Sequence, residues 1–225
     1  MKENRVGNED SSLPVGREPT DNLWEAMFTQ RAIRYWQDKP VPRDLLEKVI
    51  SAASKAPSGS NTQPWVFVVI DEQSKRQQIG QALRTIYENA EPLQNLIAAG
   101  EKSENKTERL MLTGARAFFS QLEKAPAMVI PCLYGLSSPT QDPESILAGS
   151  SIYGAVQNLM LAARALGLGT VLTTAHGMLD AQLRDALQLP DDAYPVALIP
   201  IGYPDANFGP TTRKGLDEIL RWNTW

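Results

Sequence analysis

The sequence predicts a domain that contains both helices and a buried sheet, and three observations support this. Four short apolar runs have the length and β-branched content of strands, and they cover 66–70, 127–134, 170–175 and 195–204. Longer segments between these runs repeat apolar residues at helical spacing. Turns rich in proline and glycine separate the two kinds of segment. The chain has 225 residues, enough for one large or two small domains.

Composition and charge argue against several classes of function. A net charge of −4 disfavours nucleic-acid binding, which draws on clustered Lys and Arg. Cys132 is the only cysteine and lies in an apolar run, so we expect an inert buried thiol. No apolar stretch is expected to reach the length of a membrane span, and residues 1–21 lack the apolar core of a secretory signal. We therefore expect a cytoplasmic protein, without membrane or nucleic-acid partners, that carries a flexible polar extension over 1–21.

Two arginines follow the first predicted helix. That helix is expected to begin at Asn22, with Glu25 three residues on as in a capping box. It leads into Arg31 and Arg34, which lie beside aromatic residues. Such a pair can clamp an anion and stack on a ring, or it can be a solvated pair at a helix C-terminus. A clear amphipathic helix is then predicted over 43–56.

The most informative stretch is the turn from Pro57 to Trp65. Pro57 and Pro64 fix φ near both ends. A simple reversal needs only about two to five residues, whereas this turn carries five polar side chains. They suit the polyfunctional edge of a flat ligand, with an ordinary solvated loop as the alternative. The five are Ser58, Ser60, Asn61, Thr62 and Gln63.

The middle of the chain is predicted to be helical over 71–90 and 105–124, and irregular over 91–106. The region 85–124 is expected either to cover a site or to be plain packing. A long apolar helix over 146–166 is expected to be central, with small residues near its start that let another backbone approach. Pro131 is expected at a sheet edge or beside a break in the ladder.

Glycines and a histidine follow the long helix. The glycines at 167 and 169 come after a helix and before a strand, the reverse of the dinucleotide-binding order. His176, the only histidine, is either a proton donor or a structural side chain. Near the C-terminus, Arg213 and Lys214 can hold a phosphate or form a surface pair, and 216–222 is predicted to be a terminal helix or arm.

Several of these segments together resemble the FMN-dependent nitroreductase family. They are Arg31–Arg34, Ala56–Trp65, and Gln157–Leu159 with Ala165–Thr170. Gly202–Pro204, followed by Arg213 and Lys214, is similar to that family's closing segment. The turn that ends in Gln63-Pro64-Trp65 is the most specific motif, and the resemblance covers nearly the whole chain.

The resemblance implies an α+β fold with a mixed, mainly antiparallel sheet flanked by helices, in a single domain over 22–225. It also implies a domain-exchanged homodimer with the flavin at the interface. A C-terminal arm over 204–225 would reach onto the partner, and 85–124 would form a helical cover.

The resemblance further implies bound FMN, with NADH or NADPH as co-substrate. Hydride would pass through flavin N5 to a nitroaromatic, a quinone or a similar electron-poor aromatic acceptor, with no protein catalytic group and no metal. Arg34 would face the pyrimidine side, Arg213 would meet the phosphate, and Thr174 and Ala175 would present backbone near N5. The other implied flavin contacts are Arg31, Ala32, Gln157, Thr212 and Lys214, with Pro57, Ser58, Gly59, Ser60 and Asn61 from the partner subunit.

Three positions depart from the family pattern. Gln30 stands where the family has its first arginine, Ala32 where it usually has serine, and Ser151 where it often has aspartate. The first two weaken the expected phosphate pocket. The rival functions are reductive dehalogenation, reduction of activated alkenes, and flavin binding without turnover.

Overall fold

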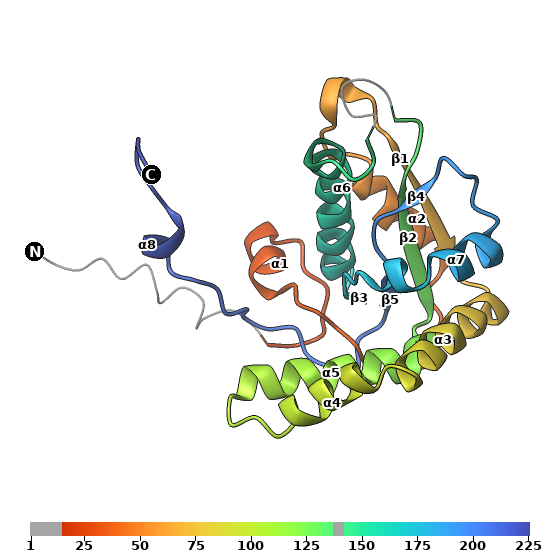
Figure 1. The fold of residues 1–225 in the computed structure, drawn as a ribbon. Coiled ribbons are helices and arrows are strands. Elements are labelled where there is room, and N and C mark those ends of the chain that lie inside the picture. Colours follow the sequence, from red (N-terminus) through yellow and green to blue (C-terminus); the bar gives the residue numbers. More distant parts are fainter. Residues whose placement is uncertain (1–14, 137–141) are drawn as a thin grey trace, which may run out of the picture.

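The computed structural model describes residues 15–136 and 142–225, and these form a helix–sheet–helix arrangement (Figure 1). The helices are α1 (Leu23–Thr29), α2 (Arg43–Ala53), α3 (Gln73–Glu88), α4 (Glu91–Gly100), α5 (Lys106–Gln121), α6 (Ile146–Ala165), α7 (Asp180–Leu187) and α8 (Leu216–Ile219). The strands are β1 (Trp65–Ile70), β2 (Ala127–Leu133), β3 (Gly169–Thr170), β4 (Tyr194–Pro195) and β5 (Ile199–Gly202). Short 3₁₀ turns are η2 (Gly59–Asn61), η3 (Leu122–Lys124) and η4 (Ala175–Met178).

The sheet is mixed and mainly antiparallel, as predicted. Its strand order is β1-β2-β5-β3, and β4 also pairs with β2. All pairings between these strands are antiparallel, and β1 runs against β2 from Trp65 opposite Leu133 to Ile70 opposite Met128. A parallel bridge joins Ala32 to Thr170 of β3, and this bridge makes the sheet mixed. Strand β1 is therefore an edge strand.

Strand β2 separates two hydrophobic cores. Successive side chains of a strand point to opposite faces, and every residue of β2 is buried. Val129 and Leu133 pack with the α2–α6 side, whereas Met128, Ile130 and Cys132 pack with the side formed by α3, α5 and α7. This double burial explains why the run has no polar alternation.

Pro131 lies in the central strand beside a break in the ladder, which is one of the two predicted places. Strand β5 pairs with β2 up to Val129, and β4 pairs with it from Cys132. Between the two, the Pro131 carbonyl accepts a hydrogen bond from Val196 at 2.9 Å. The predicted strand over 195–204 is therefore wrong as one unit, because it splits into β4 and β5 on either side of this break.

The long central helix is α6. Its buried residues include Ile152, Ala155 and Leu159, all at 0% exposure, and they pack against α2 and β2. By length and composition alone, α6 is long and apolar enough to cross a membrane. The expectation that no apolar stretch reaches this length is therefore wrong. Burial of this helix in the α2–α6 core explains its apolar composition equally well, as for the core helix of a globular domain.

Two further local predictions are wrong. The segment 91–106 contains α4, because Pro92 lies in the first helical turn, where proline needs no N–H partner. The strand predicted over 170–175 is only β3, and the chain then leaves the ladder except for a bridge from Thr173 to Leu198. The turn η4 begins at Ala175.

The start of the described chain lies beside the segment around Phe208. Gly16 and Phe208 exchange backbone hydrogen bonds at 3.3 and 2.7 Å, and Thr20 donates to the Ala165 carbonyl at 3.0 Å. Part of the extension expected over 1–21 lies outside the described residues. Beyond Thr211 the chain runs away from the body, and residues 212–225 are all exposed (Figure 1).

Candidate functional site

Arg34 lies in a cavity of about 300 Å³ between the end of the sheet and helix α5. Thr174 and Ala175 border the same cavity, so the structure brings together three of the predicted flavin contacts. The remaining walls are mostly apolar and include Phe118 and Phe119 of α5, Leu172 and Met178. Arg34 is the only charged group among the described residues that line this cavity.

The backbone fixes the direction of the Arg34 side chain. The Ile33 N–H donates to the Thr170 carbonyl at 2.9 Å, and the Ile33 side chain is buried against Gly169. A Cβ on Gly169 would lie 2.8 Å from Ile33, so only glycine fits there. Because side chains alternate along extended backbone, Ala32 and Arg34 point away from Ile33. Arg34 then packs on Gly114, where a Cβ would lie 3.1 Å from the guanidinium.

Arg34 is a half-buried cation that forms no salt bridge in the described part of the chain. Burial lowers the pKa of its guanidinium, and only Tyr35 opposes that shift. Its charge therefore favours an anionic or electron-rich ligand in the cavity.

Thr174 contributes a free backbone donor. Its N–H has no protein acceptor among the described residues, whereas the neighbouring Thr173 is bonded to Leu198 through both backbone and hydroxyl. The Thr174 carbonyl accepts from Gly177 and so starts η4. The loop between β3 and η4 thus presents an N–H beside the apolar cavity wall.

The turn from Pro57 to Trp65 is ordered by its own hydrogen bonds. Ser58 Oγ accepts from the Gln63 N–H at 2.9 Å, and Thr62 Oγ1 donates to the Gly59 carbonyl at 2.9 Å. Ser60, Asn61 and Gln63 all have φ near +50°, which is costly for residues with a Cβ. Gly59 is the only glycine of the turn, yet the left-handed positions belong to its neighbours. The result is a rigid turn whose Ser60, Asn61 and Gln63 side chains are exposed.

Within one chain this turn lies far from Arg34. The Gly59 N–H donates to Ser151 Oγ in the second turn of α6, whereas Ile33 bonds to β3 beyond the last turn of α6. A helix rises about 1.5 Å per residue, so Ser151 and Ala165 are about 20 Å apart along the axis. Figure 1 shows η2 and β3 at opposite ends of α6. The structure therefore does not bring Asn61 and Arg34 together in a single subunit.

The residues predicted to bind the phosphate lie on two segments that meet at the end of α1. Thr211 donates to the Phe28 carbonyl from its N–H at 3.2 Å, so Thr212, Arg213 and Lys214 leave the body next to Arg31. Arg31, Thr212, Arg213 and Lys214 are all exposed, and Arg213 donates to the adjacent Thr212 carbonyl at 2.8 Å. Their contact with a phosphate stays a prediction.

The positions that depart from the family pattern have structural partners. Gln30 Nε2 lies 3.9 Å from the Met160 sulfur, and Ala32 pairs with Thr170. Gln157 is exposed one turn before Met160 on α6, so it faces the same end of α1. Ser151 caps the Gly59 N–H, which accounts for a hydroxyl at this place.

His176 and Cys132 lie outside the Arg34 cavity. His176 borders a separate cavity of about 380 Å³ with Tyr153 and Tyr194, and burial lowers the pKa of its imidazole. Cys132 is 1% exposed, and burial raises the pKa of its thiol to about 11, as expected for an inert cysteine. No group of three or more His, Cys, Asp or Glu that could hold a metal is found among residues 15–136 and 142–225.

A family profile and several relatives match this chain. The profile described as "Nitroreductase family" matches residues 28–203. The chain belongs to the nitroreductase family. An iodotyrosine deiodinase of Danio rerio is 28% identical over 205 residues, covering 89% of this chain and 67% of the relative. A putative NADH dehydrogenase/NAD(P)H nitroreductase of Methanothermobacter thermautotrophicus is 28% identical, covering 87% and 83%.

Solved structures show the same nitroreductase-like fold. An FMN- and NADPH-dependent nitroreductase NfnB from sphigopyxis sp. strain HMH superposes with a TM-score of 0.68 at 24% identity, covering 91% of this chain and all of the other. Oxidised iodotyrosine deiodinase bound to FMN and 3-iodo-L-tyrosine superposes with a TM-score of 0.67 at 21% identity, with the same coverage. At these identities the likeness establishes the fold alone.

Proposed function

We propose that this nitroreductase family protein is an FMN-dependent oxidoreductase that works as a homodimer. It takes reducing equivalents from NADH or NADPH and passes them to an electron-poor aromatic acceptor such as a nitroaromatic or a quinone. The observation that carries this proposal is the Arg34 cavity, in which the Arg34 cation and the Thr174 backbone lie beside apolar walls. The cytoplasmic location expected from the sequence is part of the same proposal.

The donor set of this cavity fits FMN. A flavin ring needs apolar walls for its faces, an N–H donor at its polar edge and positive charge where electron density accumulates. Leu172 and Phe118 supply the first, Thr174 the second and Arg34 the third. Arg31 and Arg213 supply exposed cations for the phosphate. The flavin would carry the hydride chemistry, and the protein would bind and orient both reactants and exclude water.

The homodimer follows from the separation of the two halves of the expected site. Asn61 and its turn lie about 20 Å along α6 from the Arg34 end, so one flavin reaches both only when a second subunit supplies the turn. The chain also has the surfaces for such a dimer. Strand β1 is an unpaired edge, with Val66 at 44% and Val69 at 36% exposure, beside an open groove of about 570 Å³. Such an edge is a template for added backbone.

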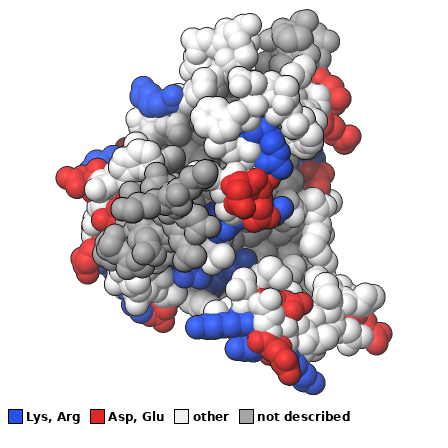
Figure 2. All heavy atoms as spheres, turned by 90° about the vertical axis from the view of Figure 1, so that its left-hand side faces the viewer, with Lys and Arg blue, Asp and Glu red and all other residues white. Residues whose placement is uncertain are grey.

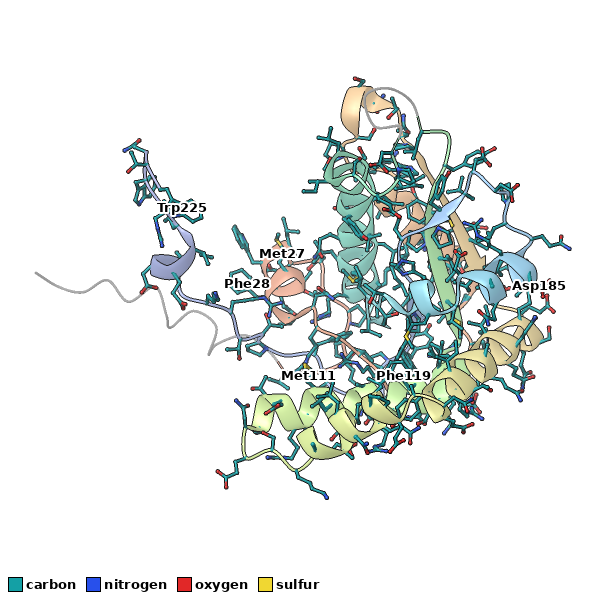
Figure 3. All side chains as sticks on the ribbon, in the orientation of Figure 1. Met27, Phe28, Met111, Phe119, Asp185 and Trp225 are labelled. Carbon is teal, nitrogen blue, oxygen red and sulfur yellow. The ribbon has the colours of Figure 1, made fainter. Side chains whose placement is uncertain are left out.

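The C-terminal arm is the element that would pack on this edge and groove of a second subunit. Leu216, Ile219, Trp222 and Trp225 have exposures of 52%, 62%, 78% and 104%. Figure 3 shows Met27, Phe28 and Trp225 on one side of the molecule, and Figure 2 shows this side with broad neutral areas between interspersed charges. An exposed apolar arm next to the exposed apolar face of α1 has more unburied hydrophobic surface than a monomer usually keeps.

The decisive experiment is an absorption spectrum of the purified protein before and after NADPH addition. We expect a yellow protein, or one that takes up added FMN, whose flavin band bleaches on reduction and returns with a nitroaromatic or a quinone. A colourless protein that takes up no FMN would refute the proposal.

Reductive dehalogenation is the second candidate, favoured by the deiodinase relatives. No acidic residue lines the Arg34 cavity in the described chain, so an amino-acid ammonium group would have no carboxylate there. This favours an uncharged aromatic over a free iodotyrosine. Steady-state oxidation of NADH and NADPH with a nitroaromatic, a quinone, a halophenol and 3-iodotyrosine separates the candidates. Rapid turnover of 3-iodotyrosine alone would establish the deiodinase reading.

A further inference from the structure

Arg164 is a fully buried arginine near the C-terminal end of the apolar helix α6. Its side chain is 3% exposed and makes three charge-assisted hydrogen bonds. Nε donates to Thr29 Oγ1, one terminal nitrogen to the Glu18 carbonyl and the other to Glu25 Oε1, each at 2.9 Å. None of these acceptors lies on α6, so the arginine serves contacts between segments.

These contacts reach both chain segments that lead to the predicted phosphate site. Thr29, the last residue of α1, also donates from its hydroxyl to the Glu25 carbonyl at 2.6 Å. Arg31 follows two residues later. On the other side, the guanidinium stacks over the Phe208 ring at 4.2 Å. Phe208 is bridged to Gly16, and Thr211 bonds to the Phe28 carbonyl before the chain continues to Arg213.

We propose that Arg164 is a positioning residue for the phosphate-binding corner of the site. It fixes the end of α1 and the start of the C-terminal arm against each other, so that Arg31 and Arg213 converge on one anion. Arg164 itself is buried behind this corner and touches no ligand. The inference rests on the proposed function, because the anion is the FMN phosphate.

The test compares FMN with riboflavin, which has the same ring and no phosphate. Dissociation constants of both are measured on the full chain by flavin fluorescence, with thermal unfolding recorded alongside. Arg164→Lys keeps the charge but cannot reach three acceptors. We expect it to weaken FMN binding about tenfold while riboflavin binding changes little. Thr29→Val removes one acceptor with little change of shape, and should move the FMN constant in the same direction if Arg164→Lys fails to fold.

Arg76 provides the matched control. It is a half-buried arginine on α3 that donates to the Glu123 and Ala125 carbonyls at 3.1 and 2.8 Å, away from α1 and the arm. Arg76→Lys should lower the melting temperature while leaving the ratio of FMN to riboflavin affinity unchanged. In an Arg213→Ala background, Arg164→Lys should weaken FMN binding by a smaller factor than it does alone, because both changes act on the same phosphate-binding corner.

Three outcomes decide the matter. A selective loss of FMN affinity supports the positioning role. An equal loss of FMN and riboflavin affinity, tracking the melting temperature as in Arg76→Lys, would overturn it and leave the proposed function standing. A wild-type protein that binds neither flavin would overturn the proposed function and this inference with it.

Discussion

Strand β2 and the C-terminal arm are both rich in large apolar side chains, yet the fold treats them in opposite ways. Every residue of β2 is buried between two cores, whereas residues 212–225 are all exposed. The body of the protein therefore buries its own hydrophobic side chains, and the arm does not. This contrast supports the proposal that a second copy of the chain buries the arm, and each prediction below tests one side of it.

The largest effect is expected in the body. Leu159→Ala removes a side chain with 0% exposure from the α2–α6 core and leaves a cavity. The free energy of unfolding should fall by about 2–5 kcal/mol in urea denaturation. A loss below 1 kcal/mol would contradict the packing described for α6.

The buried thiol should make stability depend on alkaline pH. The pKa of Cys132 is raised from 9.0 to about 11 in the folded protein, so the unfolded chain loses its proton first as pH rises. Its contribution is fully present below pH 9 and is lost as pH rises through about 11, by up to about 2–3 kcal/mol. Urea denaturation from pH 8 to 11 checks this, with Cys132→Ala as the control that should lack this component.

The arm should matter for association rather than for folding of the body. Trp222→Ala should weaken the dimer by about 2 kcal/mol, because buried tryptophans dominate interfaces. Measured below the dimer dissociation constant, its unfolding free energy should change by less than about 0.5 kcal/mol. Sedimentation at several concentrations gives the first quantity and urea denaturation the second. If the wild-type protein binds flavin as a monomer, the arm is not buried by a second copy, and the contrast between body and arm loses its explanation.

The smallest predicted effect falls where the body meets the proposed ligand. Arg34→Ala should weaken FMN binding about tenfold, or about 1.4 kcal/mol, and slow reduction by NADPH, because the cation beside the developing negative charge is lost. Arg34→Lys keeps the charge and is the control, with an intermediate effect expected. Unchanged flavin content and turnover in Arg34→Ala would show that Arg34 does not bind the flavin.

Local chemistry made parts of the molecule predictable. Asn22 accepts from the Glu25 N–H at 3.1 Å and caps α1, because the signal lies within four residues. The break beside Pro131 also follows from one missing N–H. The split of 195–204 into two strands did not follow, because it depends on which end of β2 each half meets.

Only part of the candidate site could be predicted from such local sequence signals. Arg34 was singled out beside aromatic residues, and Thr174 and Ala175 were implied only by the family resemblance, but their meeting in one cavity depends on Ile33 packing over Gly169. Arg164 was missed, although an arginine among alanines and leucines with no acidic residue one turn away was a usable signal.

The sequence by itself determined most of the helices, strands β1 and β2, the proline-bounded turn and the family, because each depends on neighbours along the chain or on motifs read in order. Only the tertiary structure decided that Arg34 and Thr174 share a cavity while Asn61 lies at the far end of α6, and that the arm stays uncovered. Those facts depend on contacts between residues 92 or more positions apart, and no local pattern encodes such distances.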